Sequence, residues 1–357
     1  MVGPKSKDNH FSIGNSILKR TFFHFVTAAS LAAASMVSAV QAGVVSLGSF
    51  SGEFVTVGDP NNTADGTHGA VSQTFDIMKF EFTNQQYVQF LNTVDANGTN
   101  PNLIYNASMD TDGRGGIILT SGAPAGSKYA VKANYGNKPV VFVSWFDAAR
   151  VSNWLHNGAT STSSMETGAY NLNNATSGVA VAMIAGARFF IPSENQWYKA
   201  AYYKGGSTNA GYWTYGTQSN LDPTQVTASG TGDGSAGNSG NFANYVSGGD
   251  WNGQNGNVTT VGTNGGPSFY GAFDMTGNVG EWNDLDRTSS MRGNRGGDWN
   301  NGIINQKSSA RSISSAEGES NRLGFRLASE HVPEPSMMVI GTLFGLGGLA
   351  AKRRRKK

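Results

Sequence analysis

The sequence has 357 residues and no cysteine, which excludes disulfide bonds, thiolate metal sites and cysteine nucleophiles. Glycine contributes 48 residues, about twice its usual share of ~7%, and the plentiful aromatic residues exclude a disordered chain. The formal net charge of +2 hides an asymmetry, because residues 1–42 carry +3 and residues 332–357 carry +5, which leaves −6 for residues 43–331. This acidic central region lacks the basic surface that nucleic acid binding needs. We therefore expect one loop-rich globular domain over residues 43–331 and no nucleic acid partner.

Residues 1–42 have the pattern of an export signal. Lys5, Lys7, Lys19 and Arg20 form a positive leader, an apolar stretch of small residues follows, and small residues precede Gly43. This order is typical of a signal peptide that a signal peptidase removes. We predict cleavage after Ala42; an uncleaved membrane anchor is the alternative.

The last 26 residues have the pattern of a second targeting signal. The tripeptide Pro333-Glu334-Pro335 precedes an apolar run over 336–351 and six basic residues at 352–357. The run is shorter than the ~20 residues of a full membrane span, and its basic flank is typical of the cytoplasmic side. This tail resembles the PEP-CTERM sorting signal of Gram-negative bacteria. The resemblance implies transient membrane contact through a C-terminal transmembrane helix, processing by an exosortase, and an exported protein that is outer membrane-associated, on the cell surface or extracellular. A plain C-terminal anchor is the alternative.

The first part of the central region predicts short strands and one helix. Alternating apolar residues predict strands at 54–57 and 75–80. Apolar residues three and four positions apart predict a helix over 84–94, with Thr83 as its N-cap. The glycine-rich stretch at 97–137 is expected to contain a hairpin.

Two further strand and helix pairs follow, and then a long loop region. Residues 139–143 and 187–192 predict strands. Ser144 and Ser193 each predict the N-cap of a helix, the second with Gln196 in a capping box. Residues 205–266 are rich in Gly, Ser, Asn and Thr, which predicts loops, but their aromatic residues indicate that these loops pack onto the domain.

Residues 274–282 combine two carboxylates with two glycines, an asparagine and a tryptophan. Asp274 and Glu281 offer hard oxygens, and Gly277 allows a sharp turn. Such a set suits Ca²⁺, which takes six to eight oxygen ligands. A tight turn with solvated acids is the alternative.

Six motifs in order resemble the sulfatase-modifying factor family, whose named member is the formylglycine-generating enzyme. They cover nearly all of the central region: 81–87 (EFTNQQY), 139–148 (PVVFVSWFDA), 191–201 (IPSENQWYKAA), 274–282 (DMTGNVGEW), 295–299 (RGGDW) and 324–327 (GFRL). The resemblance implies an α/β (α+β), C-type-lectin-like fold with sparse secondary structure and long glycine-rich loops.

The resemblance also implies one or two structural calcium ions. The first set of ligands consists of the side chains of Asp274 and Glu281 and the carbonyls of Gly277 and Val279. The second set consists of Asn244, Tyr245, Asn255 and Asn257. Asn255 stands where the family usually has aspartate, and the loss of one charge weakens calcium binding there.

The catalytic chemistry of the family is not expected here. The formylglycine-generating enzyme holds Cu(I) with two cysteines, which would fall within residues 298–311, and this chain has none. Some relatives hold iron with three histidines, but the spacing of His68, His156 and His331 does not suggest such a triad. We therefore expect neither copper nor iron.

Two functions from different classes remain. The first is a non-catalytic protein that binds a glycan or a protein of the extracellular matrix, such as an exopolysaccharide or a surface protein. Its candidate ligand-binding residues are Tyr212, Trp213, Trp251, Asp298, Trp299 and Asn301, and we expect the aromatic residues among them, together with Tyr215, to be exposed.

The second function is an enzyme with a changed, cysteine-free active site that includes Asp298, Asn301, Arg311 and Arg326. A carboxyl group with a raised pKa beside Asn301 would favour the enzyme, whereas pairing of the two arginines with buried acids would indicate a structural role. A modifying factor that depends on a partner for its metal or thiol is a third possibility, without support in the sequence.

Overall fold

The computed structural model describes residues 43–179, 181–285 and 289–331. The predicted signal peptide and the predicted sorting signal with its transmembrane helix lie outside these residues. Within the described ranges, no helix has both the length and the hydrophobicity needed to cross a membrane.

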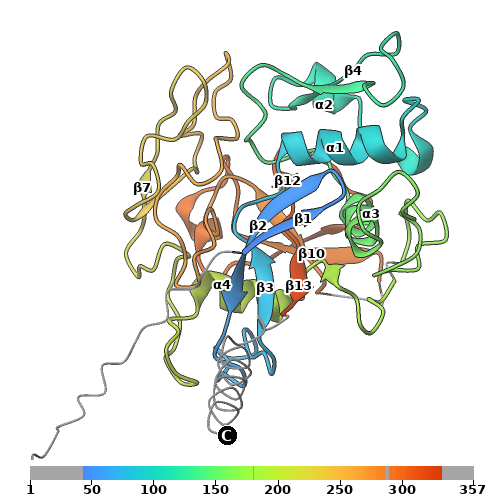
Figure 1. Ribbon diagram of the computed structural model, residues 1–357. Coiled ribbons are helices and arrows are strands. Elements are labelled where there is room, and N and C mark those ends of the chain that lie inside the picture. Colours follow the sequence, from blue (N-terminus) through green and yellow to red (C-terminus); the bar gives the residue numbers. More distant parts are fainter. Residues whose placement is uncertain (1–42, 180, 286–288, 332–357) are drawn as a thin grey trace, which may run out of the picture. The chain divides into compact units, whose positions relative to one another are not determined.

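A five-stranded antiparallel sheet contains strands from both ends of the described chain (Figure 1). Its order is β1 (Gly43–Leu47), β2 (Phe50–Val57), β3 (Phe75–Met78), β13 (Ala328–Glu330) and β6 (Phe189–Phe190). The strand predicted at 54–57 is confirmed within β2, and the strand predicted at 75–80 is confirmed as β3, which ends two residues earlier, at Met78. The strand predicted at 187–192 is reduced to the two residues of β6, which pair with Ala328 and Ser329.

A four-stranded mixed sheet carries the predicted calcium motif. Its order is β11 (Ser312–Ser315), β10 (Met291–Arg295), β9 (Gly280–Asn283) and β12 (Leu323–Gly324). β12 runs parallel to β9 and places Gly324 opposite Glu281. The motifs at 274–282, 295–299 and 324–327 are therefore neighbours in space.

Three helices begin with the same reciprocal cap. They are α1 (Asn84–Val94), α3 (Trp145–His156) and α4 (Glu194–Tyr202). In each, the N-cap side chain accepts the backbone N–H of the third helical residue, and the side chain of that residue accepts the N-cap N–H: Thr83 with Gln86, Ser144 with Asp147, and Ser193 with Gln196. Such a capping box satisfies two backbone donors that the helix leaves free. The three predicted helix starts are confirmed.

The strand predicted at 139–143 is wrong. These residues are buried as expected, but only Pro139 makes a strand-like bridge, to Thr83. Phe142 has a φ of +61°, which is uncommon for a residue with a bulky side chain and cannot continue a strand. The amide of Phe142 instead donates to the carbonyl of Ser320 at 2.9 Å. The apolar run that predicted a strand therefore serves core packing in an irregular segment.

The insertion at 97–137 contains the predicted hairpin, formed by β4 (Ile117–Leu119) and β5 (Tyr129–Val131). Two short helices that the sequence did not predict precede it, η1 (Pro101–Leu103) and α2 (Ser108–Thr111). The remaining short helix, η2 (Ile303–Gln306), follows β10.

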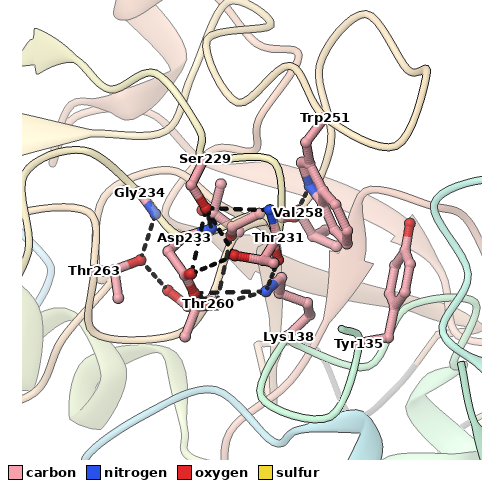
Figure 2. A network of polar contacts seen from close by, with 12 residues as sticks. Tyr135, Lys138, Ser229, Thr231, Asp233, Gly234, Trp251, Val258, Thr260 and Thr263 are labelled. Atoms are coloured by element: carbon pink, nitrogen blue, oxygen red, sulfur yellow. Dashed lines mark hydrogen bonds and ion pairs between the residues drawn. The ribbon is translucent and has the colours of Figure 1, made fainter. Parts of the chain in front are cut away.

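The long loop region at 205–266 has only two short strands, β7 (Thr224–Gln225) and β8 (Phe242–Ala243). A buried lysine holds part of it in place (Figure 2). Nζ of Lys138 donates to the carbonyl of Thr231 at 2.9 Å and to Oγ1 of Thr260 at 2.5 Å, and it lies 4.9 Å from the centre of the Trp251 ring. Burial lowers the pKa of Lys138. One ammonium group therefore joins two loops that have few backbone hydrogen bonds of their own.

We expect Lys138→Met to lower the free energy of unfolding by about 1–3 kcal/mol, because the carbonyl of Thr231 and the hydroxyl of Thr260 would lose the charged donor that joins their loops. Urea denaturation followed by tryptophan fluorescence measures the change. Lys128→Met is the matched control, since its ammonium bonds to the carbonyl of Ser121 at the surface. Equal stability of the two variants would contradict the role of Lys138.

Candidate functional site

Residues 274–282 form a buried turn that leads into β9. Asp274 is 8% exposed and Glu281 is fully buried, so the alternative of solvated acids is wrong. Asp274, Gly277 and Asn278 have φ values of +57°, +82° and +63°. A Cβ at position 277 would lie 2.4 Å from the carbonyl oxygen of Asn244. Glycine is therefore required there, by both the backbone conformation and the close approach of a second loop.

Glu281 pairs with Arg326 in the interior of the domain. Nε of Arg326 lies 2.6 Å from Oε2 of Glu281, and Nη2 lies 2.7 Å from Oε1. The other Arg326 donors reach the carbonyls of Met78, Lys79 and Phe273. All five N–H groups of the guanidinium thus have acceptors, which is what a buried arginine requires.

Two more buried acids surround this ion pair. Asp274 accepts from the amide of Gly262 at 2.6 Å and from Nδ2 of Asn264 at 2.8 Å. Glu81 is fully buried, and among the described residues its Oε1 has no hydrogen-bond partner. Burial raises the pKa of both groups, and the charge of Asp274 raises that of Glu81 further. Glu81 was not among the predicted site residues, although it opens the first family motif.

The two carboxylates of the first predicted calcium set, Asp274 and Glu281, both lie near Arg326, but protein donors already meet them. Oε2 of Glu281 accepts from Trp197 Nε1 at 2.7 Å as well as from Arg326. Calcium coordination by Glu281 would therefore have to share the carboxylate with Arg326 or displace it. In the part of the chain that is described, no group of three or more His, Cys, Asp or Glu residues could hold a metal. A calcium site here must draw on amide and backbone oxygens.

The second predicted set is brought together only in part. Asn244 and Asn257 are buried neighbours, and Nδ2 of Asn244 donates to the Asn257 carbonyl at 2.9 Å. Oδ1 of Asn244 is buried and has no partner among the described residues, which fits a missing cation. By contrast, Asn255 is exposed, and the carbonyl of Tyr245 accepts from the side chain of Gln225 at 2.7 Å.

A polar cleft of about 200 Å³ lies beside the motif at 295–299. Asp298, Asn301 and Arg322 line it, together with other small polar residues: Asn294, Asn305, Ser312, Ser314 and Ser320. A carboxylate oxygen of Asp298 accepts the amides of Asn300 and Asn301 at 2.9 and 3.0 Å. Burial raises the pKa of Asp298, and these hydrogen bonds and Arg322 oppose the rise. The cleft thus offers carboxylate, amide, hydroxyl and guanidinium groups to a ligand.

The two arginines proposed for an enzyme site have structural partners. Arg326 pairs with Glu281 as described above, and Nη1 of Arg311 lies 3.2 Å from Oε2 of Glu194. Glu194 is buried and also binds Arg295 at 2.6 Å. These contacts fit the structural role for both arginines.

The expected exposure of the aromatic residues is wrong for three of them. Tyr215 is fully buried, and Trp251 and Trp299 are 6% and 4% exposed. Their faces are covered from within: Lys138 lies over the ring of Trp251, and Arg114 lies 4.5 Å from the ring centre of Trp299. Tyr212 and Trp213 are half-buried, so these two residues retain surface that a ligand could contact.

The three histidines contact different partners. Nδ1 of His68 lies 3.8 Å from Glu194, and Nδ1 of His331 lies 3.0 Å from Asp76. Nδ1 of His156 accepts the backbone amide of Arg188 at 3.1 Å. Each histidine is thus accounted for by its own local contact.

We expect Arg326→Met to lower the free energy of unfolding by about 3–5 kcal/mol, because it leaves Glu281 as an unpaired buried charge. Denaturant unfolding of the purified variant measures the loss. Lys79→Met is the control, since Lys79 pairs with the half-exposed Glu53, and such a surface pair contributes about 0–1 kcal/mol. Similar losses of unfolding free energy for the two variants would contradict the larger contribution of the buried pair.

Comparison with known proteins identifies the family. Residues 24–331 match the sulfatase-modifying factor enzyme 1-like domain, FGE-sulfatase. Similar solved structures include variable protein 1 of Treponema denticola (19% identity, 81% of this chain and 99% of that chain, TM-score 0.48), CarF (18%, 82% and 97%, TM-score 0.44) and PvdO from Pseudomonas aeruginosa (19%, 81% and 98%, TM-score 0.44). No curated protein sequence matches the chain. The chain therefore belongs to the sulfatase-modifying factor enzyme 1-like family, and its sparse α+β fold is the one expected for that family.

Proposed function

We propose that this protein is an exported, non-catalytic binding protein whose calcium-stabilised domain binds a glycan or a protein of the extracellular matrix. The observation that carries the proposal is the cleft beside the 295–299 motif. It presents Asp298, Asn301 and Arg322 among serine and asparagine side chains, in a chain without cysteine.

The lining of the cleft suits a ligand that is rich in hydroxyl groups. A sugar hydroxyl both donates and accepts hydrogen bonds, and the cleft offers acceptors on Asp298 and donors on Arg322. Tyr212 and Trp213 do not line this cleft, and Nζ of Lys204 lies 4.5 Å from the centre of the Trp213 ring, so their half-buried side chains would contact only a glycan that extends beyond the cleft. An exopolysaccharide is therefore the ligand we favour, with a surface protein as the other candidate.

The proposed location rests on the two ends of the sequence. A signal peptidase removes residues 1–42, and an exosortase recognises the tail at 332–357 during a transient membrane contact. The protein then remains on the surface of a Gram-negative cell, is associated with the outer membrane, or is released. A binding protein for matrix material fits each of these places.

Calcium has a structural role in this proposal. The unpartnered Oδ1 of Asn244 and the surplus of buried carboxyl groups around Arg326 support a bound cation. In the second predicted set, Asn244 offers a buried oxygen without a hydrogen-bond partner among the described residues, and Ca²⁺ bound there would tie loops that have few hydrogen bonds of their own. Copper and iron have no part in the proposal.

We expect the purified full chain to contain one or two calcium ions by mass spectrometry. Chelation should lower its melting temperature by about 4–8 °C, because a ligand that binds only the folded state stabilises it. Asn244→Ala should reduce both the calcium content and the shift on chelation. Asn238→Ala, at an exposed asparagine, is the matched control. Unchanged calcium content in Asn244→Ala would contradict the assignment.

We also expect the full chain to bind glycans on an array, and Asn301→Ala to weaken that binding about tenfold, since it removes a hydrogen-bonding group from the cleft. Titration of the best glycan into both proteins measures the change. Asn238→Ala again serves as the control. A silent array, or equal affinity of Asn301→Ala and the parent, would contradict glycan binding in this cleft.

One observation favours the second candidate, an enzyme with a changed active site. Asp298 has a raised pKa and lies beside Asn301, as expected of an acid or base in catalysis. Mass spectrometry of the bound glycans after incubation separates the two functions. A change in glycan mass that Asp298→Asn abolishes would establish the enzyme, whereas an unchanged mass supports binding alone.

A further inference from the structure

A second and larger cavity lies at the start of α3. Its volume is about 470 Å³, within the range of cavities that hold small molecules. Four segments line it: the loop around Tyr105 and Asn106, the first turns of α3 with Asp147 and Arg150, the loop at 176–177, and the turn that carries Glu319.

Two acids contact each other in this cavity. The side chains of Asp147 and Glu319 are hydrogen bonded, which requires a proton between them. Burial and the charge of Asp147 raise the pKa of Glu319 to about 8. Asn106 donates to the other side of Glu319, and Asp147 also accepts from the cap residue Ser144 at 2.7 Å. The pair is thus held in place, and Glu319 keeps its proton at neutral pH.

A buried arginine that lines the same cavity has a hydrogen-bond donor without an acceptor among the described residues. Arg150 is fully buried; its Nε donates to Glu166 at 2.8 Å and its Nη2 to the carbonyl of Ala175 at 2.8 Å. Within the described residues, Nη1 has no hydrogen-bond partner. Buried donors are nearly always paired in native proteins, so this one indicates a missing acceptor.

We propose that this cavity binds a vicinal amino alcohol, the group that a hexosamine with a free amino group presents. The ammonium lies between Asp147 and Glu319 and replaces their shared proton. A neighbouring hydroxyl oxygen accepts from Nη1 of Arg150.

The charges and the size of the cavity favour this ligand over others. Asp147, Glu317 and Glu319 line the cavity, and Glu166 already neutralises Arg150, so an anion is disfavoured. A metal ion would satisfy the carboxylates but would leave the Nη1 donor without an acceptor. A monosaccharide supplies both groups and suits the volume.

The test uses titration calorimetry on the full chain at about pH 6.5, where Glu319 still holds its proton. The probes are glucosamine, N-acetylglucosamine, glucose and calcium chloride. We expect glucosamine to bind at least about tenfold more tightly than the two neutral sugars, because a buried carboxylate pair gains a charged partner. Repeating the titration in buffers of different ionisation heat should reveal release of roughly one proton per ligand.

The variant Glu319→Gln keeps the shape of the side chain but cannot exchange a proton for an ammonium. It should weaken glucosamine binding about tenfold and abolish the proton release. Glu53→Gln, at a half-exposed carboxylate in another part of the domain, is the matched control. A chitosan oligosaccharide distinguishes a polymer from a free sugar as the source of the amine.

Three results would overturn the proposal. They are equal affinity for glucosamine and glucose, binding by Glu319→Gln that matches the parent, and displacement of glucosamine by calcium alone. The inference does not rest on the function proposed above, since it uses none of the residues of the Asp298 cleft. Loss of array signal in Asn301→Ala with intact glucosamine binding would separate the two sites.

Discussion

The buried pair of Glu281 and Arg326 is the contact on which the arrangement of the two sheets depends. Glu281 belongs to β9 of the four-stranded sheet, and Arg326 reaches the carbonyls of Met78 and Lys79 at the end of β3 in the five-stranded sheet. Taking both charges out of water is costly, and the cost is offset only if every remaining donor is paired. Nε1 of Trp197, in α4, also donates a hydrogen bond to Glu281. One guanidinium thus fixes elements from three parts of the chain.

Other buried cations also join distant segments in regions with little regular secondary structure. Lys138 joins two loops of the 205–266 region, Arg295 joins Glu194 to the carbonyls of Ser308 and Ala310, and Arg150 joins α3 to the loop that carries Glu166. In each case a buried cation binds backbone carbonyls or an acid from a distant segment. Side chains therefore provide cohesion that longer strands would provide in other folds.

The helix starts were predictable from local sequence, because the two residues of a capping box are only three positions apart. The strand at 139–143 was mispredicted since hydrophobicity reports burial, and burial does not fix φ at Phe142. The aromatic surface was mispredicted for a related reason: Trp251 and Trp299 are covered by Lys138 and Arg114, which are far away in sequence. Contacts of that kind carry no local signal. The family motifs placed Asp298 and Asn301 in one cleft, but the meeting of Asp147 with Glu319 depends on the packing of distant segments and could not be predicted.

The residues that stabilise the fold are different from the residues that line the cleft and the cavity, and this difference affects how such a domain can change its function. The five donors of Arg326 end on Glu281 and on backbone carbonyls, and none of these acceptors belongs to the Asp298 cleft or to the Glu319 cavity. Backbone carbonyls are present whatever the side chain, so substitutions in the cleft do not remove acceptors from the buried network. Residues that line the cleft can therefore vary at small cost in stability. A domain of this family can change the residues of its cleft and keep its fold, because the groups that hold the fold together are not the groups that meet a ligand.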